Sequence, residues 1–237
     1  MQQLTAAGFL FDMDGTLVDS TPVVEAVWTE FSRANGLDPA EVLGYAHGRQ
    51  AIDTLARFLP QRSPAERGEL LSALVAEEVA RTEGIVEVPG AGALLTALIG
   101  AGAPVAVVTS APRELAVARM TAAGVPVPPV LVAAEDVERG KPDPQAYLLA
   151  AERLGVPAAS CFAFEDAPAG LAAAVASGAC VVVVGVYESA VSEGLGRVLD
   201  YVGELSVTEA GGEWSTGLVA ASTTPAARTA AGQPSAR

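Results

Sequence analysis

The amino-acid sequence predicts an α/β protein in which a doubly wound parallel β-sheet is interrupted by an inserted block of helices. Short apolar runs of strand length alternate with segments of helical periodicity over residues 88–184, a pattern typical of a parallel sheet with helices on both faces. Residues 22–81 contain helical patterns and no strand-like run. Polar residues directly follow several of the apolar runs, which is where open α/β sheets place their ligands.

Five apolar runs have the length and content of buried strands. They cover residues 9–11, 105–108, 130–132, 161–164 and 180–184, with Tyr201-Val202 as a short sixth candidate. Helical segments follow or separate them at residues 93–101, 113–123, 141–154 and 170–177. Because strands joined by helical crossovers run parallel, we expect these strands to share one sheet.

The inserted helical block begins at Ser20-Thr21-Pro22, where proline occupies the first turn of a helix. Ser63-Pro64-Ala65-Glu66 is a capping box that starts a later helix of the block. We therefore divide the chain into an α/β core (residues 1–17 and 88–210) and a helical domain (residues 18–87). Because the last segment is rich in Ala, Thr, Ser, Pro and Gly, we expect residues 211–237 to form a disordered tail.

The composition excludes several classes of function. The formal net charge of −14 argues against non-specific nucleic-acid binding, which needs a basic surface. No apolar run reaches the ~18 residues of a membrane span, and the N-terminus lacks the basic and apolar regions of a signal peptide. We therefore expect a cytoplasmic protein, a monomer or weak dimer, that acts on a small molecule and binds neither nucleic acid nor membrane.

The distribution of cations in this acidic chain is uneven. There is one lysine, Lys141, and one histidine, His47, whereas arginine supplies the other basic side chains. A protein that handles an anion has to provide positive charge locally. A need for a compact ammonium explains the single lysine, and chance explains it equally well, so this observation alone leaves both interpretations open.

Four groups of polar residues lie at or just beyond the predicted strand ends. They are Asp12 and Asp14, Thr109 and Ser110, the loop at Lys141, and Glu165 and Asp166. An aspartate-rich turn that caps the next helix would explain the first group alone. Because all four groups meet at one edge of a parallel sheet, a reaction centre explains them better than helix capping does.

The residue types at this edge fit phosphoryl transfer. Carboxylate oxygens suit Mg²⁺, which keeps water or phosphate oxygens among its ligands. An ionised aspartate can attack phosphorus, and a second carboxyl two residues later can act as acid and then base. A lysine and a hydroxyl can hold the phosphoryl oxygens, and such positioning and charge neutralisation is what this reaction needs.

The chain resembles the haloacid dehalogenase superfamily over about residues 8–205. The resemblance lies in four motifs, which occur in order: Asp12-Met13-Asp14-Gly15-Thr16, the strand that ends in Thr109, Gly140-Lys141-Pro142-Asp143, and Glu165-Asp166-Ala167-Pro168-Ala169-Gly170. It implies that the core is Rossmann-like and that the helical domain is the family's small α-helical cap.

The resemblance also implies roles for the acidic residues. Asp12 would be the nucleophile and a Mg²⁺ ligand, and Asp14 the general acid and base, with its backbone carbonyl on the metal. Asp166 would ligate the metal, and Glu165 would do so directly or through water. Members that displace halide from carbon lack an aspartate at the position of Asp14, so its presence favours phosphoryl transfer over dehalogenation.

Further residues are expected to bind substrate. The resemblance implies that Thr109 and Lys141 bind phosphate, with Ser110 beside them. In the cap, His47-Gly48-Arg49 resembles the His-Gly-x-Arg stretch of the superfamily's glycerol-phosphate and deoxyglucose-phosphate phosphatases, although here arginine follows glycine directly. His47 and Arg49 would then belong to a substrate-specificity loop. The alternative is a polar turn between two cap helices.

These observations predict a Mg²⁺-dependent phosphatase that hydrolyses a small sugar or polyol phosphate through an aspartyl-phosphate. Two other functions remain open. A phosphomutase similar to β-phosphoglucomutase would use the same core residues and return the phosphoryl group to sugar. A catalytically inactive binding protein could also be built on this scaffold.

Overall fold

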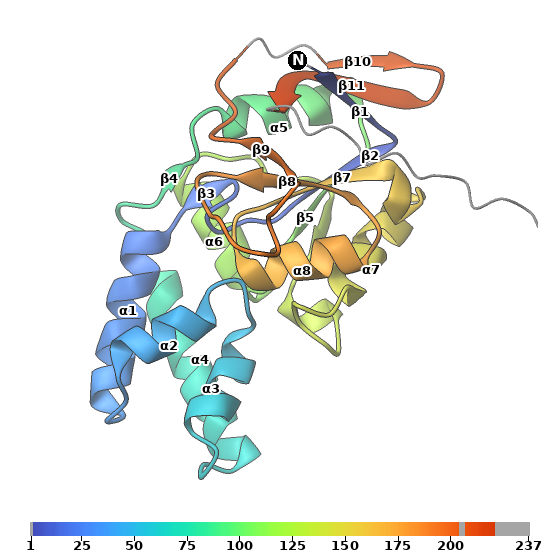
Figure 1. Cartoon of the computed structure of the whole chain (residues 1–237). Coiled ribbons are helices and arrows are strands. Elements are labelled where there is room, and N and C mark those ends of the chain that lie inside the picture. Colours follow the sequence, from blue (N-terminus) through green and yellow to red (C-terminus); the bar gives the residue numbers. More distant parts are fainter. Residues whose placement is uncertain (1, 204–206, 221–237) are drawn as a thin grey trace, which may run out of the picture.

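The computed structural model describes residues 2–203 and 207–220. Within them, one six-stranded sheet has the order β6-β5-β2-β7-β8-β9, with all neighbours parallel (Figure 1). Its strands are β2 (Gly8–Phe11), β5 (Val105–Val108), β6 (Val130–Val132), β7 (Cys161–Glu165), β8 (Cys180–Val184) and β9 (Gly196–Val198). The strand order reverses at β2, and such a reversal opens a crevice at the carboxyl edge of a sheet.

Helices cover both faces of this sheet, which confirms the predicted α/β fold. One face carries α5 and α6, whose leucines and alanines pack on Phe9, Phe11 and Phe164, and the other carries α7 and α8, packed around Leu10. Burial on both faces explains why the strands are apolar runs without alternation. The helices are α5 (Ala91–Ala101), α6 (Arg113–Ala122), α7 (Gln145–Leu154) and α8 (Pro168–Ala176).

The four helices between β3 (Val18–Asp19) and β4 (Val86–Glu87), which we call the cap, lie at the carboxyl edge of the sheet (Figure 1). The predicted capping box is present. The Ser63 side chain accepts a hydrogen bond from the backbone amide of Glu66, and the Glu66 side chain accepts one from the backbone amide of Ser63. The chain passes between core and cap twice, and the two connecting segments pair as a two-stranded antiparallel sheet of β3 and β4. The cap helices are α1 (Thr21–Ala34), α2 (Pro39–Ala46), α3 (Ala51–Phe58) and α4 (Pro64–Ala80).

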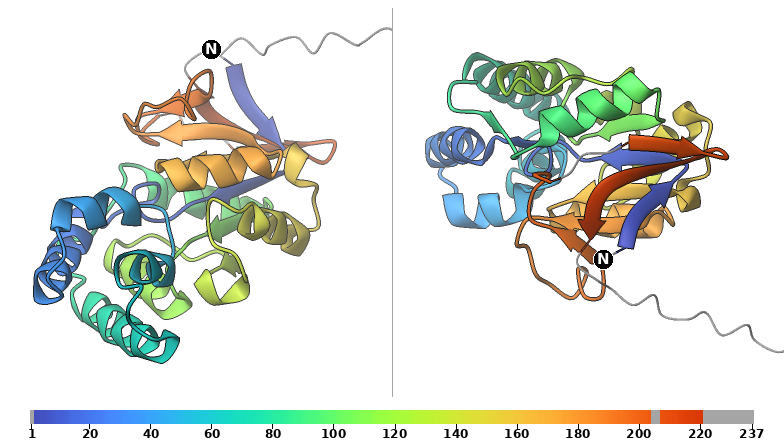
Figure 2. Two further views of the ribbon diagram at one scale, coloured as in Figure 1. Left: turned by 60° about the horizontal axis from the view of Figure 1, so that its bottom comes forward. Right: turned by 90° about the horizontal axis from the view of Figure 1, so that it is seen from above.

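A three-stranded antiparallel sheet on the side of the core remote from the cap corrects the expectation for the end of the chain (Figure 2). Strand β11 (Glu213–Ala220) pairs with both β1 (Gln2–Ala6) and β10 (Val207–Ala210). The expectation of a disordered tail over residues 211–237 is therefore wrong for residues 213–220, and residues 221–237 lie outside the described part of the chain.

Two local features explain why this strand forms despite its composition. Gly211 and Gly212 have φ angles of 65° and 86°, as in the two-residue hairpin turns whose twist matches that of the strands they connect. Trp214 of β11 packs against the main hydrophobic core. A glycine pair followed by a tryptophan is thus a hairpin signal that low-complexity composition conceals.

The last strand of the parallel sheet also differs from the prediction. The sixth strand is β9, and Tyr201-Val202 is not a strand. Tyr201 is instead fully buried, with its ring edge-on to Phe11 and Phe164. Its apolar character therefore reflects core packing.

Two short 3-10 helices, η1 (Ala134–Asp136) and η2 (Ala158–Ser160), complete the secondary structure of the described residues. None of the helices described for this chain has the length and hydropathy needed to cross a membrane.

Candidate active site

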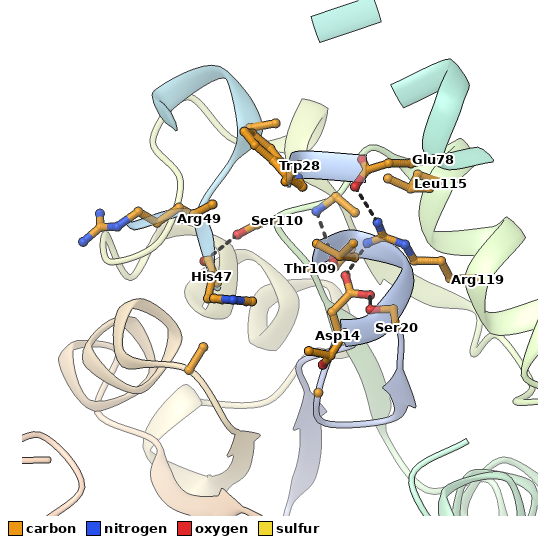
Figure 3. Close-up of a pocket in the computed structure, with 18 of the residues that line it drawn as sticks. Asp14, Ser20, Trp28, His47, Arg49, Glu78, Thr109, Ser110, Leu115 and Arg119 are labelled. Carbon is orange, nitrogen blue, oxygen red and sulfur yellow. Dashed lines mark hydrogen bonds and ion pairs between the residues drawn. The ribbon is translucent and has the colours of Figure 1, made fainter. Parts of the chain in front are cut away.

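A cavity of about 110 Å³ lies between the carboxyl edge of the sheet and the cap (Figure 3). Because core and cap form opposite walls, a ligand in this cavity would contact both. Its polar lining includes Asp12, Asp14, Thr109, Ser110, Arg119 and Asp166 from the core, and His47, Arg49 and Glu78 from the cap.

The loop after β2 brings Asp12 and Asp14 to this cavity. The Asp12 amide still donates to the carbonyl of Phe164 on β7 at 3.0 Å, so Asp12 continues the sheet. Gly15, with a φ of 83°, then turns the chain back, and its amide donates to the Val18 carbonyl at 2.8 Å. A Cβ atom at Gly15 would overlap the Asp166 carboxylate, so glycine is what allows the loop to approach the end of β7.

Lys141 is buried beneath the cavity, against Asp12. Its Nζ donates to Asp12 Oδ1 at 2.5 Å, to Glu165 Oε1 at 2.7 Å and to the Val108 carbonyl at 3.0 Å. Burial alone would lower the pKa of Lys141, but the Asp12 and Glu165 carboxylates outweigh burial and raise it. Lys141 is therefore a fixed cation next to Asp12. Its contact with a phosphate stays a prediction, because its three donors already point to protein oxygens.

Glu165 is the buried carboxylate of the pair at the end of β7. Its Oε1 accepts from Lys141 and from the Tyr147 hydroxyl at 2.8 Å, and its Oε2 accepts from the two backbone amides that follow it, at 3.1 and 3.2 Å. A Cβ atom at Gly170 would overlap this carboxylate, so α8 can start here only with glycine at that position. Both oxygens of Glu165 thus serve to hold Lys141 and the loop. Tyr147 has no signal in the sequence, because a tyrosine inside a helix is most simply a core residue.

Asp12, Glu165 and Asp166 form an acidic cluster that fits a metal ion. One carboxylate oxygen from each lies within 4.8 Å of the others. Burial, and next the charge of Glu165, raise the pKa of Asp12 well above its usual value and that of Asp166 to about 8. The ammonium of Lys141 supplies one positive charge against these three carboxylates. Buried carboxylates are costly without further neutralisation, and oxygen donors are the ligands that hard divalent cations prefer.

Two side chains hold Asp14 in the cavity wall (Figure 3). Ser20 Oγ donates to Oδ1 at 2.5 Å, and Arg119 Nη1 donates to Oδ2 at 2.8 Å. Arg119 Nη2 also donates to Glu78 Oε1 of the cap at 3.0 Å. From the sequence, Ser20 is expected to be a polar residue of the hinge or the cap and not a catalyst. Arg119 and Glu78 attract no attention, because charged residues inside amphipathic helices normally form a solvated face.

The predicted residues Thr109 and Ser110 both line the cavity, beside Asp12 and Asp14. Thr109 Oγ1 accepts a hydrogen bond from the backbone amide of Ala111 at 3.0 Å, which fixes the turn after β5. Ser110 Oγ donates to the Gly48 carbonyl at 3.0 Å and so contacts the cap loop. Ser110 therefore links core and cap, and its contact with a substrate remains a prediction.

His47 and Arg49 line the cavity from the cap side. The His47 Nε2 atom lies 3.9 Å from a Glu25 carboxylate oxygen, and both side chains are about half exposed. The Arg49 guanidinium lies 4.5 Å from the centre of the Tyr45 ring, which is a cation–π contact. The structure thus places this loop between α2 and α3 and beside the cavity. This position fits both a polar turn and a specificity loop, and a contact of the loop with a substrate stays a prediction.

Comparisons with known proteins agree with these motifs. The model of the family "haloacid dehalogenase-like hydrolase" matches residues 6–178. Hexitol phosphatase A of Escherichia coli is 49% identical over 177 residues, which are 75% of this chain and 82% of that protein. Glycerol-1-phosphate phosphohydrolase 2 of Saccharomyces cerevisiae is 35% identical over 182 residues, which are 73% of this chain and 72% of that protein.

A solved structure gives the same result. CbbY from Rhodobacter sphaeroides, in complex with phosphate, matches with a TM-score of 0.71 at 27% identity, covering 83% of this chain and 95% of that one. The resemblance drawn from the four motifs is therefore confirmed. The chain belongs to the haloacid dehalogenase-like hydrolase family.

Proposed function

We propose that this protein is a Mg²⁺-dependent phosphatase that hydrolyses a small sugar or polyol phosphate through an aspartyl-phosphate on Asp12. The observation that carries the proposal is the pair Asp12 and Asp14 in one cavity wall, with Lys141 behind Asp12 and the cap opposite. The relatives named as hexitol and glycerol-1-phosphate phosphatases support the substrate class.

Asp12 is arranged to act as the nucleophile. Lys141 binds Oδ1, so the carboxylate is held in one orientation and its other oxygen, Oδ2, is the one free to attack phosphorus. Attack forms the Asp12–phosphorus bond and breaks the bond from phosphorus to the alcohol oxygen. The Thr109 hydroxyl lines the same wall and can hold a phosphoryl oxygen.

Asp14 is arranged to move the proton. Because the Arg119 guanidinium is a donor only and is bound to Oδ2, the transferable proton belongs on Oδ1, where the Ser20 hydroxyl can accept instead of donate. Asp14 gives this proton to the leaving alcohol. The resulting carboxylate then takes a proton from water, whose oxygen attacks phosphorus and releases phosphate from Asp12.

Mg²⁺ would be held by Asp12 and Asp166, with Glu165 near enough to act directly or through water. When bound, it neutralises the charge of the carboxylates and of the phosphoryl oxygens.

The decisive experiment compares the wild-type protein with Asp12→Asn on a panel of hexitol, hexose and glycerol phosphates, with Mg²⁺ or with EDTA. We expect phosphate release from one or more polyol or sugar phosphates, and its loss in EDTA or in Asp12→Asn. Retained activity in Asp12→Asn would contradict the nucleophile. With glucose 1-phosphate, isomerisation without phosphate release would identify a mutase, and no turnover of any ester would favour a binding protein.

A further inference from the structure

A chain of buried charges connects the cap to the proposed acid and base. Glu78 on cap helix α4 accepts from Nη2 of Arg119 at 3.0 Å, and Nη1 of the same guanidinium donates to Asp14 at 2.8 Å. Only 5% of the Glu78 and Arg119 side chains is exposed. Solvent therefore screens this connection far less than it screens a surface ion pair.

The guanidinium of Arg119 depends on both of these carboxylates for its orientation. Its Nε atom is buried and finds no hydrogen-bond partner among residues 2–203 and 207–220. Glu78 and Asp14 are thus the two polar anchors of the group. Loss of either one leaves a single anchor, about which the planar guanidinium can turn.

The two anchors belong to different domains. Arg119 lies on α6 of the core and Asp14 on the loop after β2, whereas Glu78 lies on α4 of the cap. Asp12 is only 6% exposed, and the cavity that it lines has the cap as its opposite wall, so a phosphate ester enters most directly when the cap moves away from the core. Such a movement carries Glu78 off, while Arg119 and Asp14 stay with the core.

We propose that Glu78 is a cap-borne positioning residue, which orients Arg119 and through it Asp14, so that the acid and base of the reaction is correctly held only when the cap is closed. This inference rests on the phosphatase function proposed above. It adds that cap closure does more than enclose the substrate, because it completes the contacts of a catalytic side chain. An open enzyme would then hold Asp14 by Ser20 and a less well oriented Arg119.

The dependence on the leaving group separates this role from a structural one. An alkyl phosphate needs Asp14 to protonate its leaving alcohol, whereas p-nitrophenolate leaves without a proton. The value of kcat/KM reports the steps up to release of the alcohol. Misplacement of Asp14 therefore lowers kcat/KM for the alkyl ester alone, while a damaged cap lowers it for both esters.

The test measures kcat/KM for Glu78→Ala with glycerol 1-phosphate, or another alkyl phosphate that the wild-type protein hydrolyses, and with p-nitrophenyl phosphate. We expect a loss of about 10- to 100-fold for the alkyl ester, part of the roughly 10²- to 10⁴-fold that a general acid contributes, and about 3-fold or less for the aryl ester. Asp14→Asn gives the limiting pattern. Glu77→Ala is the matched control, since Glu77 is an exposed neighbour on α4 that pairs with Arg81, and it should leave both values within about 2-fold.

Glu78→Gln is the control for misfolding, because glutamine retains the shape of glutamate and one oxygen that can accept from Arg119 Nη2. It should recover most of the activity lost in Glu78→Ala. Equal losses on both esters, no loss on either, or a Glu78→Gln variant as impaired as Glu78→Ala on both esters would overturn the proposal. None of these results would contradict the proposed phosphatase function. An active Asp12→Asn variant would contradict that function independently.

Discussion

Replacing Lys141 by methionine should destabilise the metal-free protein strongly. Methionine retains the length and apolar stem of lysine but removes the ammonium from its contacts with Asp12, Glu165 and the Val108 carbonyl. Lys141 is 2% exposed, and Glu165 is fully buried, so water cannot replace the lost donor. Removal of one partner from a buried ion pair typically costs about 3–5 kcal/mol. We expect that loss in the free energy of unfolding at pH 7, out of a total of roughly 5–15 kcal/mol for a domain.

The assay is urea denaturation followed by far-UV circular dichroism in EDTA, so that no metal ion compensates for the missing charge. Tyr147→Phe provides the comparison, because it removes a neutral donor to the same Glu165 oxygen while Lys141 remains. Its expected cost is about 1–2 kcal/mol. A Lys141→Met cost below that of Tyr147→Phe would refute the argument that the ammonium neutralises this cluster.

The pH dependence of the Lys141→Met variant provides a second check. Lys141 lowers the pKa of Asp12, which burial otherwise raises, so its removal raises that pKa further. A carboxyl whose pKa is higher in the folded state contributes stability at low pH and loses it as the pH rises through the folded pKa. The deficit of Lys141→Met relative to wild type should therefore shrink between pH 7 and pH ~4. A deficit that is constant over this range would indicate lost packing and not an uncompensated charge.

Three further substitutions test other parts of the structure. Gly15→Ala places a Cβ against the Asp166 carboxylate at a φ of 83°, so phosphatase activity should fall at least about tenfold, measured under saturating Mg²⁺; unchanged kinetics would mean that the loop need not approach β7. Asp136→Asn removes a carboxylate whose pKa is lowered by its bond to Arg153, so the stability that it contributes is present above about pH 4 and disappears as the pH falls through the lower folded pKa. Urea denaturation should therefore show a cost of about 1–2 kcal/mol at pH 7 and nearly none at pH ~3. Trp214→Ala should lower the free energy of unfolding by about 1–3 kcal/mol if β11 packs as described, whereas a change within about 0.5 kcal/mol would indicate a solvated tail.

The parallel sheet and the four family motifs could be predicted because their signals are local. The runs that became β2, β5, β7 and β8 are apolar over several residues, since both faces of each strand are buried. The polar residues that follow them meet at one edge because parallel strands place their carboxyl ends together. Asp12 and Asp166 follow two such strands and therefore lie in one cluster, although they are far apart in the sequence.

The antiparallel sheet at the chain ends could not be predicted in the same way. Strand β1 owes its pairing to β11, more than 200 residues later. Strand β11 itself lies in a segment whose composition resembles that of a linker. Its stability depends on the Gly211-Gly212 turn and on the burial of Trp214. The glycine pair is visible in the sequence, but the burial of Trp214 is not evident before the partner strands are known.

The supporting residues of the site escaped prediction for a related reason. Arg119, Glu78 and Tyr147 all lie inside helices, where a charged or aromatic side chain has an ordinary role. What distinguishes them is the partner that each meets across the fold. Lys141 shows the opposite case, because its singularity in the sequence drew attention to it, while its position beneath Asp12 required the structure.

If Asp12 carries the phosphoryl group during the reaction, the aspartyl-phosphate can be trapped on it. In Asp14→Asn, p-nitrophenolate still leaves, but the water that should hydrolyse the aspartyl-phosphate lacks its base. Acid quench of this variant with p-nitrophenyl phosphate and Mg²⁺, followed by borohydride reduction and peptide mass spectrometry, should reveal homoserine at position 12, together with a burst of about one p-nitrophenolate per protein. An unmodified Asp12 in a variant that shows such a burst, or a phosphoryl group on another residue, would mean that Asp12 is not the nucleophile.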